Sequence, residues 1–467
     1  MLFNSIDFIL FFPTVIFLYW VIANRSIAFR NIFLLLASYL FYGWWDWRFL
    51  SLIAFSSLID FIVGKKLEST EGSSRKWLLS LSIVSNLGLL AFFKYFNFFI
   101  NSFQDAFTFF GNPIQVNALH IILPVGISFY TFQTLSYTLD IYHRKIHASR
   151  DPIAFFAFVS FFPQLVAGPI ERASRLLPQF DTLKKWSYEI FSEGLKKMLW
   201  GFVLKVAIAD RLALYVDSIY NHAEYHSSYS HWMATFFFSI QIYCDFAGYS
   251  LIAIGCAQMM GFDLIQNFRR PYFSASFKEL WSRWHISLST WFRDYVYIPL
   301  GGSKSGASKL YRNLMITFLL SGLWHGASWT FVIWGGLHGL YLIMEKKLAP
   351  FLPKLALPLK IFSVYLLTLV GWVFFRANSL ADAWTILSGP FRSQESGLHI
   401  GDIGIFAYSI LAIMILFVVE YFEEYKPQVS LLHHRQFAVR FATILLLLVY
   451  MLSMGVFDES QFIYFQF

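Results

Sequence analysis

Apolar runs close to 20 residues long recur along the 467-residue chain, and they constrain its fold more than any other feature. A helix needs about 20 such residues to cross a bilayer, and the shorter alternating segments of a transmembrane β-barrel are absent. The composition agrees, because 57% of the residues are hydrophobic, 21% are aromatic and only 14% are charged. A soluble domain could not cover its surface with so few charges. We expect an all-α, polytopic transmembrane bundle of about 10–12 membrane segments, with additional re-entrant or half-submerged helices.

Basic residues mark every second connection between the first apolar runs. Short cytoplasmic loops carry an excess of Lys and Arg, so these connections are expected inside and the N-terminus outside. Residues 1–23 are apolar and carry no Lys or Arg at their start, which favours a retained first span over a cleaved signal peptide. The outer turns are then expected at 42–47 and 101–117. The basic residues are Arg25, Arg30, Lys65, Lys66, Arg75, Lys76, His143, Arg144, Lys145 and Arg150.

The segment 153–170 is apolar, but basic residues flank it on both sides. Both ends are therefore expected in the cytoplasm. Pro163, Gly168 and Pro169 interrupt its helix. These features predict a re-entrant segment, which is tolerated only where the broken backbone is buried in protein or lines a cavity. The alternative is an ordinary span with a kink.

Further helices are expected after residue 190, most of them as membrane spans. They lie at 193–220, 232–260, 361–375, 405–420 and 441–457. Asp245 falls within the second of these, where an acid is either the partner of another buried polar group or part of a functional pathway. The connections 378–402 and 423–440 are expected outside and inside, which places the C-terminal IYFQF outside. We find no internal repeat, so a single membrane domain is expected to cover residues 1–467.

The region 262–312 is rich in basic and aromatic residues and contains no clean span. Apolar side chains nevertheless recur with helical spacing in 278–297, which predicts a partly submerged helix with His285 on its inner face. The spaced residues are Trp281, His285, Leu288 and Phe292. A polar cytoplasmic loop is expected at 303–309.

A histidine interrupts the apolar segment 313–344 near its middle, in the sequence Trp324-His325-Gly326. An ionisable side chain in hydrocarbon is costly, so it usually faces the protein interior or a water-filled cavity and marks a functional pathway. Both flanks of the segment are basic, which predicts a hairpin with both ends in the cytoplasm. About 12 residues of helix rise roughly 18 Å into a hydrocarbon core of about 30 Å, so His325 is expected near the inner tip.

His285 and His325 are the candidate catalytic residues, because the topology brings their elements toward one submerged cavity. Burial keeps an imidazole neutral, so that it can accept a proton from a hydroxyl that attacks an acyl carbon. The alternative for each is a histidine hydrogen-bonded in a polar core. On a continuous helix His338 would lie about 20 Å beyond His325 and on another face, so we expect it to have a packing role.

Other chemistry has less support in the sequence. No third ligand accompanies the two histidines, so no metal site is expected. Cys244 and Cys256 lack the spacing of metal ligands or of a redox motif and are expected as small core residues. The net charge of +8 is explained by cytoplasmic loops, so no nucleic acid is expected as a partner.

Five motifs follow one another along the chain. They are SFYTFQTLSYTLDIYH (128–143), FFPQLVAGPIERASRLLPQF (161–180), YCDFAGYSLIAIG (243–255), RWHISLSTWFRDYVYIPLGG (283–302) and GLWHGASWTFVIWGGLHG (322–339). Together they resemble the membrane-bound O-acyltransferase (MBOAT) family, specifically its bacterial branch of alginate O-acetylation membrane proteins. One departure leaves the polymer open, since Leu251 stands where alginate-type relatives usually carry an acidic residue.

The resemblance implies a helical bundle around a tunnel that crosses the membrane. It implies that His325, in the WHG motif, is the essential catalytic residue and that His285, in the RWHIS motif, is the second tunnel histidine. Further residues expected along the tunnel are Trp324, Trp284, Asp245, Arg293 and Asp294.

The resemblance also implies the reaction, an O-acyl transfer of a group that we expect to be acetyl. The donor is expected to be a cytoplasmic thioester, either acetyl-CoA or an acyl carrier, with no permanently bound cofactor. The final acceptor is expected to be a surface polysaccharide such as alginate, reached through an extracytoplasmic acetyltransferase partner of the hydrolase-like type. The location implied is the bacterial inner membrane. Positive charge in 262–312 would favour donor phosphates or an acidic carrier, although positive-inside topology explains that charge equally well.

Three alternatives differ in their chemistry. One is acyl or D-alanyl transfer to another cell-wall polymer. Another is a transporter whose submerged histidines relay protons or line a glycan path, for which pseudo-symmetric halves would be expected and are not visible. The last is a membrane scaffold in which the histidines only pack.

Overall fold

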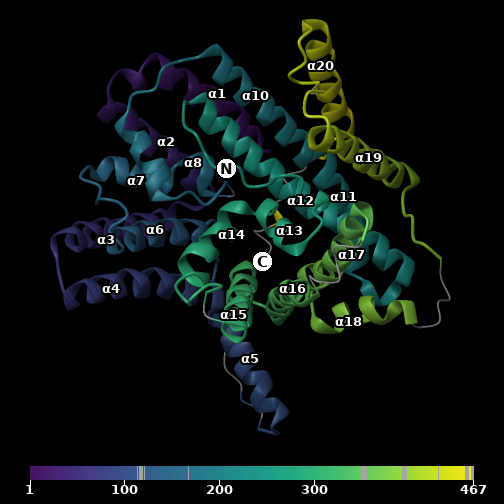
Figure 1. Cartoon of the computed structure of the whole chain (residues 1–467). Coiled ribbons are helices and arrows are strands. Elements are labelled where there is room, and N and C mark those ends of the chain that lie inside the picture. The colour runs from purple at the N-terminus through teal and green to yellow at the C-terminus, as the bar shows by residue number, and fades with distance from the viewer. Residues whose placement is uncertain are drawn as a thin grey trace. The chain divides into compact units, whose positions relative to one another are not determined.

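The computed structural model describes residues 1–112, 114, 119, 121–166, 168–304, 306–348, 355–391, 397–429, 431–457 and 462–463. Over these residues the chain is helical and contains no strand, which confirms the all-α prediction (Figure 1). They fall into two compact units, Met1–Leu195 with Ala253–Ile265 (unit 1) and Lys196–Ile252 with Gln266–Phe467 (unit 2). The prediction that a single membrane domain covers residues 1–467 remains a prediction. The expected external position of the last residues, 464–467, lies outside the described part.

Unit 1 contains the helices of the N-terminal part of the chain. They are α1 (Ile6–Val21), η1 (Ala23–Arg25), α2 (Ile27–Asp46), η2 (Trp47–Phe49), α3 (Leu50–Ser69), α4 (Ser73–Leu90), η3 (Ala91–Tyr95), α5 (Phe96–Phe109), α6 (Ile127–Tyr142), α7 (Pro152–Ser160), α8 (Phe162–Leu165), α9 (Ala173–Leu176) and η4 (Leu177–Asp181). The first residues of α10 (Tyr188–Phe202) and the last of α12 (Ser228–Met259) also belong to unit 1.

Unit 2 contains the remaining helices, including every candidate site residue. They are η5 (Val203–Ala209), α11 (Asp210–Tyr220), η6 (Ala223–Tyr225), η7 (Pro271–Phe273), α13 (Phe277–Arg283), α14 (Ile286–Phe292), η8 (Arg293–Tyr297), α15 (Ala307–His325), α16 (Trp329–Leu348), α17 (Leu357–Arg376), α18 (Leu380–Ser388), η10 (Gly389–Phe391), α19 (Ile403–Tyr425) and α20 (Phe437–Met454). The π-helical η5 joins α10 to α11, in the region predicted as one helix at 193–220.

Seven described segments are long and apolar enough to span a membrane, which makes the chain a multi-pass membrane protein. They are Ile6–Arg25, Ile27–Ser69, Ser73–Phe109, Ser228–Met259, Leu357–Arg376, Ile403–Tyr425 and Phe437–Met454. Three of these segments run through more than one helix, so the expected total of 10–12 stays a prediction. The helix α20 shows why such segments need lipid, because Leu446 and Leu452 are each 68% exposed.

Two sequence predictions fail in detail. The expected outer turn at 101–117 is wrong at its start, because α5 continues through Phe109; apolar residues in this stretch recur with helical spacing. The expected outer turn at 42–47 is likewise helical, because α2 runs to Asp46 and η2 follows directly. By contrast, the break expected in 153–170 is present, because α7 ends at Ser160 and α8 starts after Phe161.

The predicted hairpin at 313–344 is confirmed as two antiparallel helices, α15 and α16, joined at residues 326–328 (Figure 1). Glycines allow the two backbones to touch. A Cβ on Gly322 would lie 2.2 Å from the carbonyl oxygen of Phe331, and one on Gly335 would lie 2.2 Å from that of Phe318. Any larger residue would push the helices apart. The cytoplasmic placement of both hairpin ends stays a prediction.

Candidate active site

His325 is the last residue of α15, and its side chain is buried among aromatic rings of unit 2. Its imidazole lies 4.9 Å from Trp334 of α16, 5.0 Å from Trp324 and 5.5 Å from Phe375 of α17, measured between ring centroids. Gly326 follows His325 in the turn, and a larger residue would not fit there, because a Cβ would lie 2.1 Å from the ring of Phe331. The hairpin and α17 therefore hold His325 from several sides.

His285 is the second histidine, and the structure brings it to His325 with 6.3 Å between the ring centroids. Trp324 lies against both imidazoles, 5.9 Å from His285 and 5.0 Å from His325. His285 is fully buried, as predicted. The two candidate catalytic residues thus belong to one cluster.

The continuous helix predicted at 278–297 is wrong at the position of His285. The helix α13 ends at Arg283, α14 starts at Ile286, and His285 between them has a left-handed backbone with φ of 42°. A side chain with a Cβ rarely adopts that conformation and needs the surroundings to enforce it. Helical spacing alone could not reveal this break, because the apolar residues on both sides keep the same period.

The side chain of Asn267 fixes the protonation pattern of His285. Asn267 Oδ1 accepts hydrogen bonds from the backbone N–H and the hydroxyl of Ser287, and it lies 3.2 Å from His285 Nδ1. An oxygen there can only accept, so Nδ1 carries the ring proton and Nε2 has the lone pair. Nε2 has no hydrogen-bond partner among the residues that the structure describes. Burial lowers the pKa of His285, which keeps this proton-accepting ring neutral at neutral pH.

A cavity of about 1160 Å³ lies within unit 2, and although neither imidazole lines it, neighbours of both histidines do. Its wall includes Ile286, which follows His285, and Ser321, one helical turn before His325. Much of its lining is apolar or aromatic, but four basic side chains also line it: Lys278, Arg293, Lys346 and Lys360. The cavity can therefore hold a molecule with an apolar body and an anionic part.

Trp284, which directly precedes His285, and the pair Arg293 and Asp294 were also predicted along the tunnel. Trp284 is buried, with its ring 5.0 Å from Trp372 and 5.2 Å from Phe268. Arg293 lines the cavity, and its Nε donates to Asp294 Oδ1 over 2.7 Å. The two residues of this pair are adjacent in sequence.

Asp245 is a partner of a buried base, which was one of its two predicted roles. Lys205 Nζ lies 2.8 Å from Asp245 Oδ1 and 2.7 Å from Asp210 Oδ1, and all three side chains are buried. The backbone N–H of Ile463 donates to the other oxygen of Asp245 over 2.8 Å. Our sequence reading missed Lys205, although a single lysine in the apolar run from Met198 to Ala209 was a visible signal.

His338 lies nearer the site than the sequence suggested, because α15 and α16 fold back on each other. Trp334 stands between the two histidines, with its ring 4.9 Å from both His325 and His338. Neither ring nitrogen of His338 has a hydrogen-bond partner within the described part of the chain. Cys244 and Cys256 are both buried thiols, as expected of core residues. No cluster of three potential metal ligands occurs among the described residues.

Comparison with known proteins agrees with this arrangement. The family model described as "MBOAT, membrane-bound O-acyltransferase family" matches residues 78–379. A Pseudomonas aeruginosa protein named "Probable alginate O-acetylase AlgI" is 41% identical over 429 residues, which covers 88% of this chain and 81% of the relative. The Helicobacter pylori "Peptidoglycan O-acetyltransferase" is 35% identical over 424 residues, covering 83% and 79%.

A more distant relative is named as the transferase of a different acyl group. The "Teichoic acid D-alanyltransferase" of Bacillus subtilis is 29% identical over 231 residues, covering 47% of this chain and 58% of that protein. The match of the family model over more than half of the chain, and the close relatives over most of it, settle the family. The chain belongs to the membrane-bound O-acyltransferase family and is an O-acyltransferase.

Proposed function

We propose that this O-acyltransferase takes an acetyl group from a cytoplasmic thioester and passes it across the membrane to a polysaccharide. The names of the relatives support the acetyl group and the polysaccharide, because relatives at 41% and 35% identity are named as a probable alginate O-acetylase and a peptidoglycan O-acetyltransferase. Alginate is the acceptor favoured by the higher identity. The observation that carries the proposal is the pair of buried imidazoles beside the cavity.

The cavity supports a thioester donor. The four basic side chains along it would attract the phosphates of acetyl-CoA or an acidic acyl carrier, and its apolar wall would accommodate the thioester arm. The proposed donor enters from the cytoplasm, where these basic residues belong by positive-inside topology. The proposed orientation has the N-terminus outside, as the same positive-inside topology favours, and the proposed location is the bacterial inner membrane.

The reaction needs one proton transfer on each side of the acyl group. An acceptor hydroxyl forms a bond from its oxygen to the thioester carbon while His325 takes its proton. The carbon–sulfur bond then breaks, and the leaving thiolate receives that proton. His285 offers Nε2 as a second proton-accepting atom in the same cluster. The acceptor hydroxyl at the outer side would belong to the polysaccharide or to an extracytoplasmic acetyltransferase partner of the hydrolase-like type.

The test replaces His325 with Ala in a host that lacks its own copy of the gene. General base catalysis contributes about 10² to 10⁴ in rate, so ester-linked acetate released from the surface polysaccharide should fall at least about 100-fold. His231→Ala is a matched control, because His231 is also a buried histidine of unit 2 but hydrogen-bonds the backbone of Ala223. Acetate is measured per amount of membrane-inserted protein. Wild-type acetate in His325→Ala at normal abundance would exclude the proposal.

A further inference from the structure

The backbone around His285 is held by the segment that precedes α13. The N–H of Ile286 donates to the carbonyl of Asn267 over 2.8 Å, and the N–H of Arg269 donates to the carbonyl of Arg283 over 2.9 Å. Arg270 on this segment is left-handed, with φ of 43°, as His285 is with 42°. Two unfavourable backbone conformations, at Arg270 and His285, thus lie on two segments that are hydrogen-bonded to each other. Such conformations persist only where contacts with the surrounding structure hold them.

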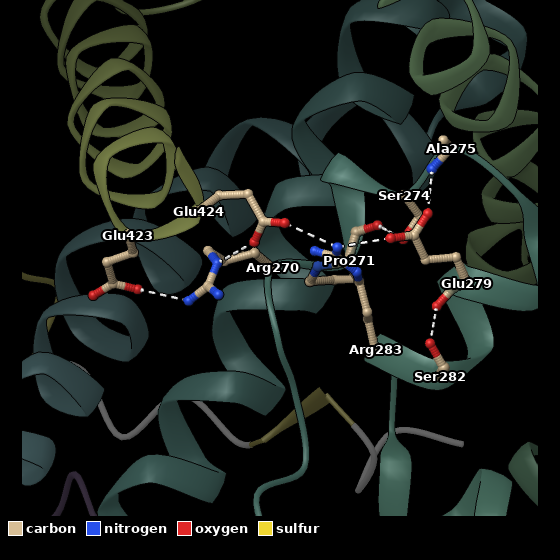
Figure 2. Close-up of polar contacts among 9 residues, drawn as sticks. All are labelled: Arg270, Pro271, Ser274, Ala275, Glu279, Ser282, Arg283, Glu423 and Glu424. Atoms are coloured by element: carbon tan, nitrogen blue, oxygen red, sulfur yellow. Dashed lines mark hydrogen bonds and ion pairs between the residues drawn. The ribbon is translucent and has the colours of Figure 1, made fainter. Parts of the chain in front are cut away.

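An ionic network contacts both segments from the end of α19 (Figure 2). Glu424 Oε2 accepts from Arg270 Nε over 2.7 Å, and Glu424 Oε1 accepts from Arg283 Nη2 over 2.9 Å. Each carboxylate oxygen of this one residue therefore binds a different segment. Arg283 also binds Glu279 within α13 over 2.7 Å, and Arg270 binds Glu423 over 3.3 Å.

The charges of this network are mutually stabilising. Burial alone would lower the pKa of Arg270, but the carboxylates of Glu424 and Glu423 outweigh it and raise that pKa above its ordinary value. The side chains of Arg283 and Glu424 are only 11% and 16% exposed, whereas that of Glu423 is 47% exposed. Partly buried ion pairs hold their geometry better than exposed ones, and Glu424 joins two such pairs, one through each carboxylate oxygen. Glu424 is thus the centre of the network and Glu423 its edge.

One turn earlier on the same helix, Glu420 accepts a hydrogen bond from the hydroxyl of Tyr243. The ring of Tyr243 lies 6.0 Å from Phe268 and 6.1 Å from Trp284, the residues next to Asn267 and His285. Glu420 and Glu424 are four residues apart and share one helix face. That face of α19 therefore contacts the His285 region through a buried aromatic ring as well as through ion pairs.

We propose that Glu424 is a positioning residue for acyl transfer, which acts by holding Arg270 and Arg283 and thereby the left-handed backbone at His285. The proposal rests on the proposed function, in which His285 belongs to the catalytic cluster. A displacement of about 1 Å in a reacting group can cost 100-fold in rate, so a remote ion pair that fixes a backbone can affect turnover. Glu424 itself reaches neither imidazole through any interaction described for it.

The test compares Glu424→Gln with Glu423→Gln, the same chemical change on the neighbouring residue. Glu424→Gln should lower the rate of surface acetylation per folded protein on the order of tenfold, and Glu423→Gln less than about twofold. Glu424→Asp keeps the charge but shortens the side chain, so it should restore part of the rate. Hydrogen exchange of the peptide around residues 284–288 should rise in Glu424→Gln and not in Glu423→Gln.

The outcomes separate the two proposals. Unchanged acetylation in Glu424→Gln, or a reduced rate without faster exchange at 284–288, would overturn the positioning role while His325→Ala still tests the transfer reaction. If wild-type protein adds no acetate, the proposed function fails, but the exchange measurement still tests whether Glu424 holds the His285 backbone. If Glu424→Gln does not accumulate, Arg270→Gln, which removes the partner of Glu424 on the other segment, supplies both measurements, and wild-type rate and exchange there would overturn the role.

Discussion

The two histidines of the site are supported by different kinds of interaction. His325 ends a helix whose partner helix packs against it through glycine contacts and aromatic rings. His285 lies in a break between two seven-residue helices and depends on the amide of Asn267, two backbone hydrogen bonds and an ionic network. Apolar packing is insensitive to salt and pH, whereas hydrogen-bonded and ionic supports respond to both. The pair therefore combines a rigid imidazole with one whose position can be disturbed separately.

The largest effect is expected from a substitution that disrupts the packing of α15 against α16, which holds His325. In Gly335→Ala the new Cβ meets the carbonyl oxygen of Phe318 at 2.2 Å, so α15 and α16 must separate and the free energy of unfolding should fall by about 3 kcal/mol. Gly336→Ala is the matched control, because its nearest neighbour is a side-chain carbon of Leu319 at 3.5 Å. Thermal unfolding in detergent and membrane abundance measure the difference. Equal stability of the two variants would contradict the close packing of the hairpin.

The next largest effect is expected from a substitution that removes the hydrogen bonds of Asn267 to the His285 region. Asn267→Ala removes the acceptor of the Nδ1 proton and of both Ser287 donors, so acetylation should fall roughly 10- to 100-fold through misplacement of the ring. Stability should fall by about 1–3 kcal/mol because buried donors lose their partner. Ser250→Ala is the control, since it removes only the hydroxyl that accepts from Asn267 Nδ2 over 3.2 Å. A similar loss of acetylation in both variants would show that Asn267 does not act on His285.

The contrast between the two supports also marks what the sequence could reveal. Basic residues on both flanks and the Trp-His-Gly interruption predicted the hairpin, because both are local signals in or beside one continuous apolar segment. The residues that support His285 come from elsewhere in the chain: Asn267 precedes it by 18 residues, and Glu424, which acts through Arg270 and Arg283, follows it by 139. No periodicity links such positions, so Asn267 and Glu424 were missed. The break at His285 was missed for a related reason, since tertiary hydrogen bonds impose a conformation that local preference disfavours.

A smaller effect concerns pH. Burial lowers the pKa of His285 to about 3, whereas the unfolded chain has a pKa of about 6.5. As the pH falls below 6.5, His285 binds a proton in the unfolded state but not in the folded state, so the free energy of unfolding declines. At pH 5.5 this difference amounts to about 1.4 kcal/mol for one histidine. His285→Gln should lose that share of acid sensitivity in unfolding measured between pH 7.5 and 5.5. An unchanged pH dependence in the variant would mean that His285 is protonated in the folded protein.

The smallest effect is expected from added salt, which should act differently on the ionic contacts around His285 and on the apolar packing around His325. Raising NaCl from 0.1 to 1 M shortens the Debye length from about 10 Å to about 3 Å, which weakens partly exposed ion pairs but leaves apolar packing intact. Each such pair contributes about 0.2–1 kcal/mol, so hydrogen exchange around residues 284–288 should accelerate about two- to fivefold. Exchange in the α15–α16 hairpin should stay the same or slow slightly, because high salt does not weaken apolar contacts. Equal acceleration in both regions would show that the ionic network is not what distinguishes the support of His285, since salt would then be acting on the fold of unit 2 as a whole.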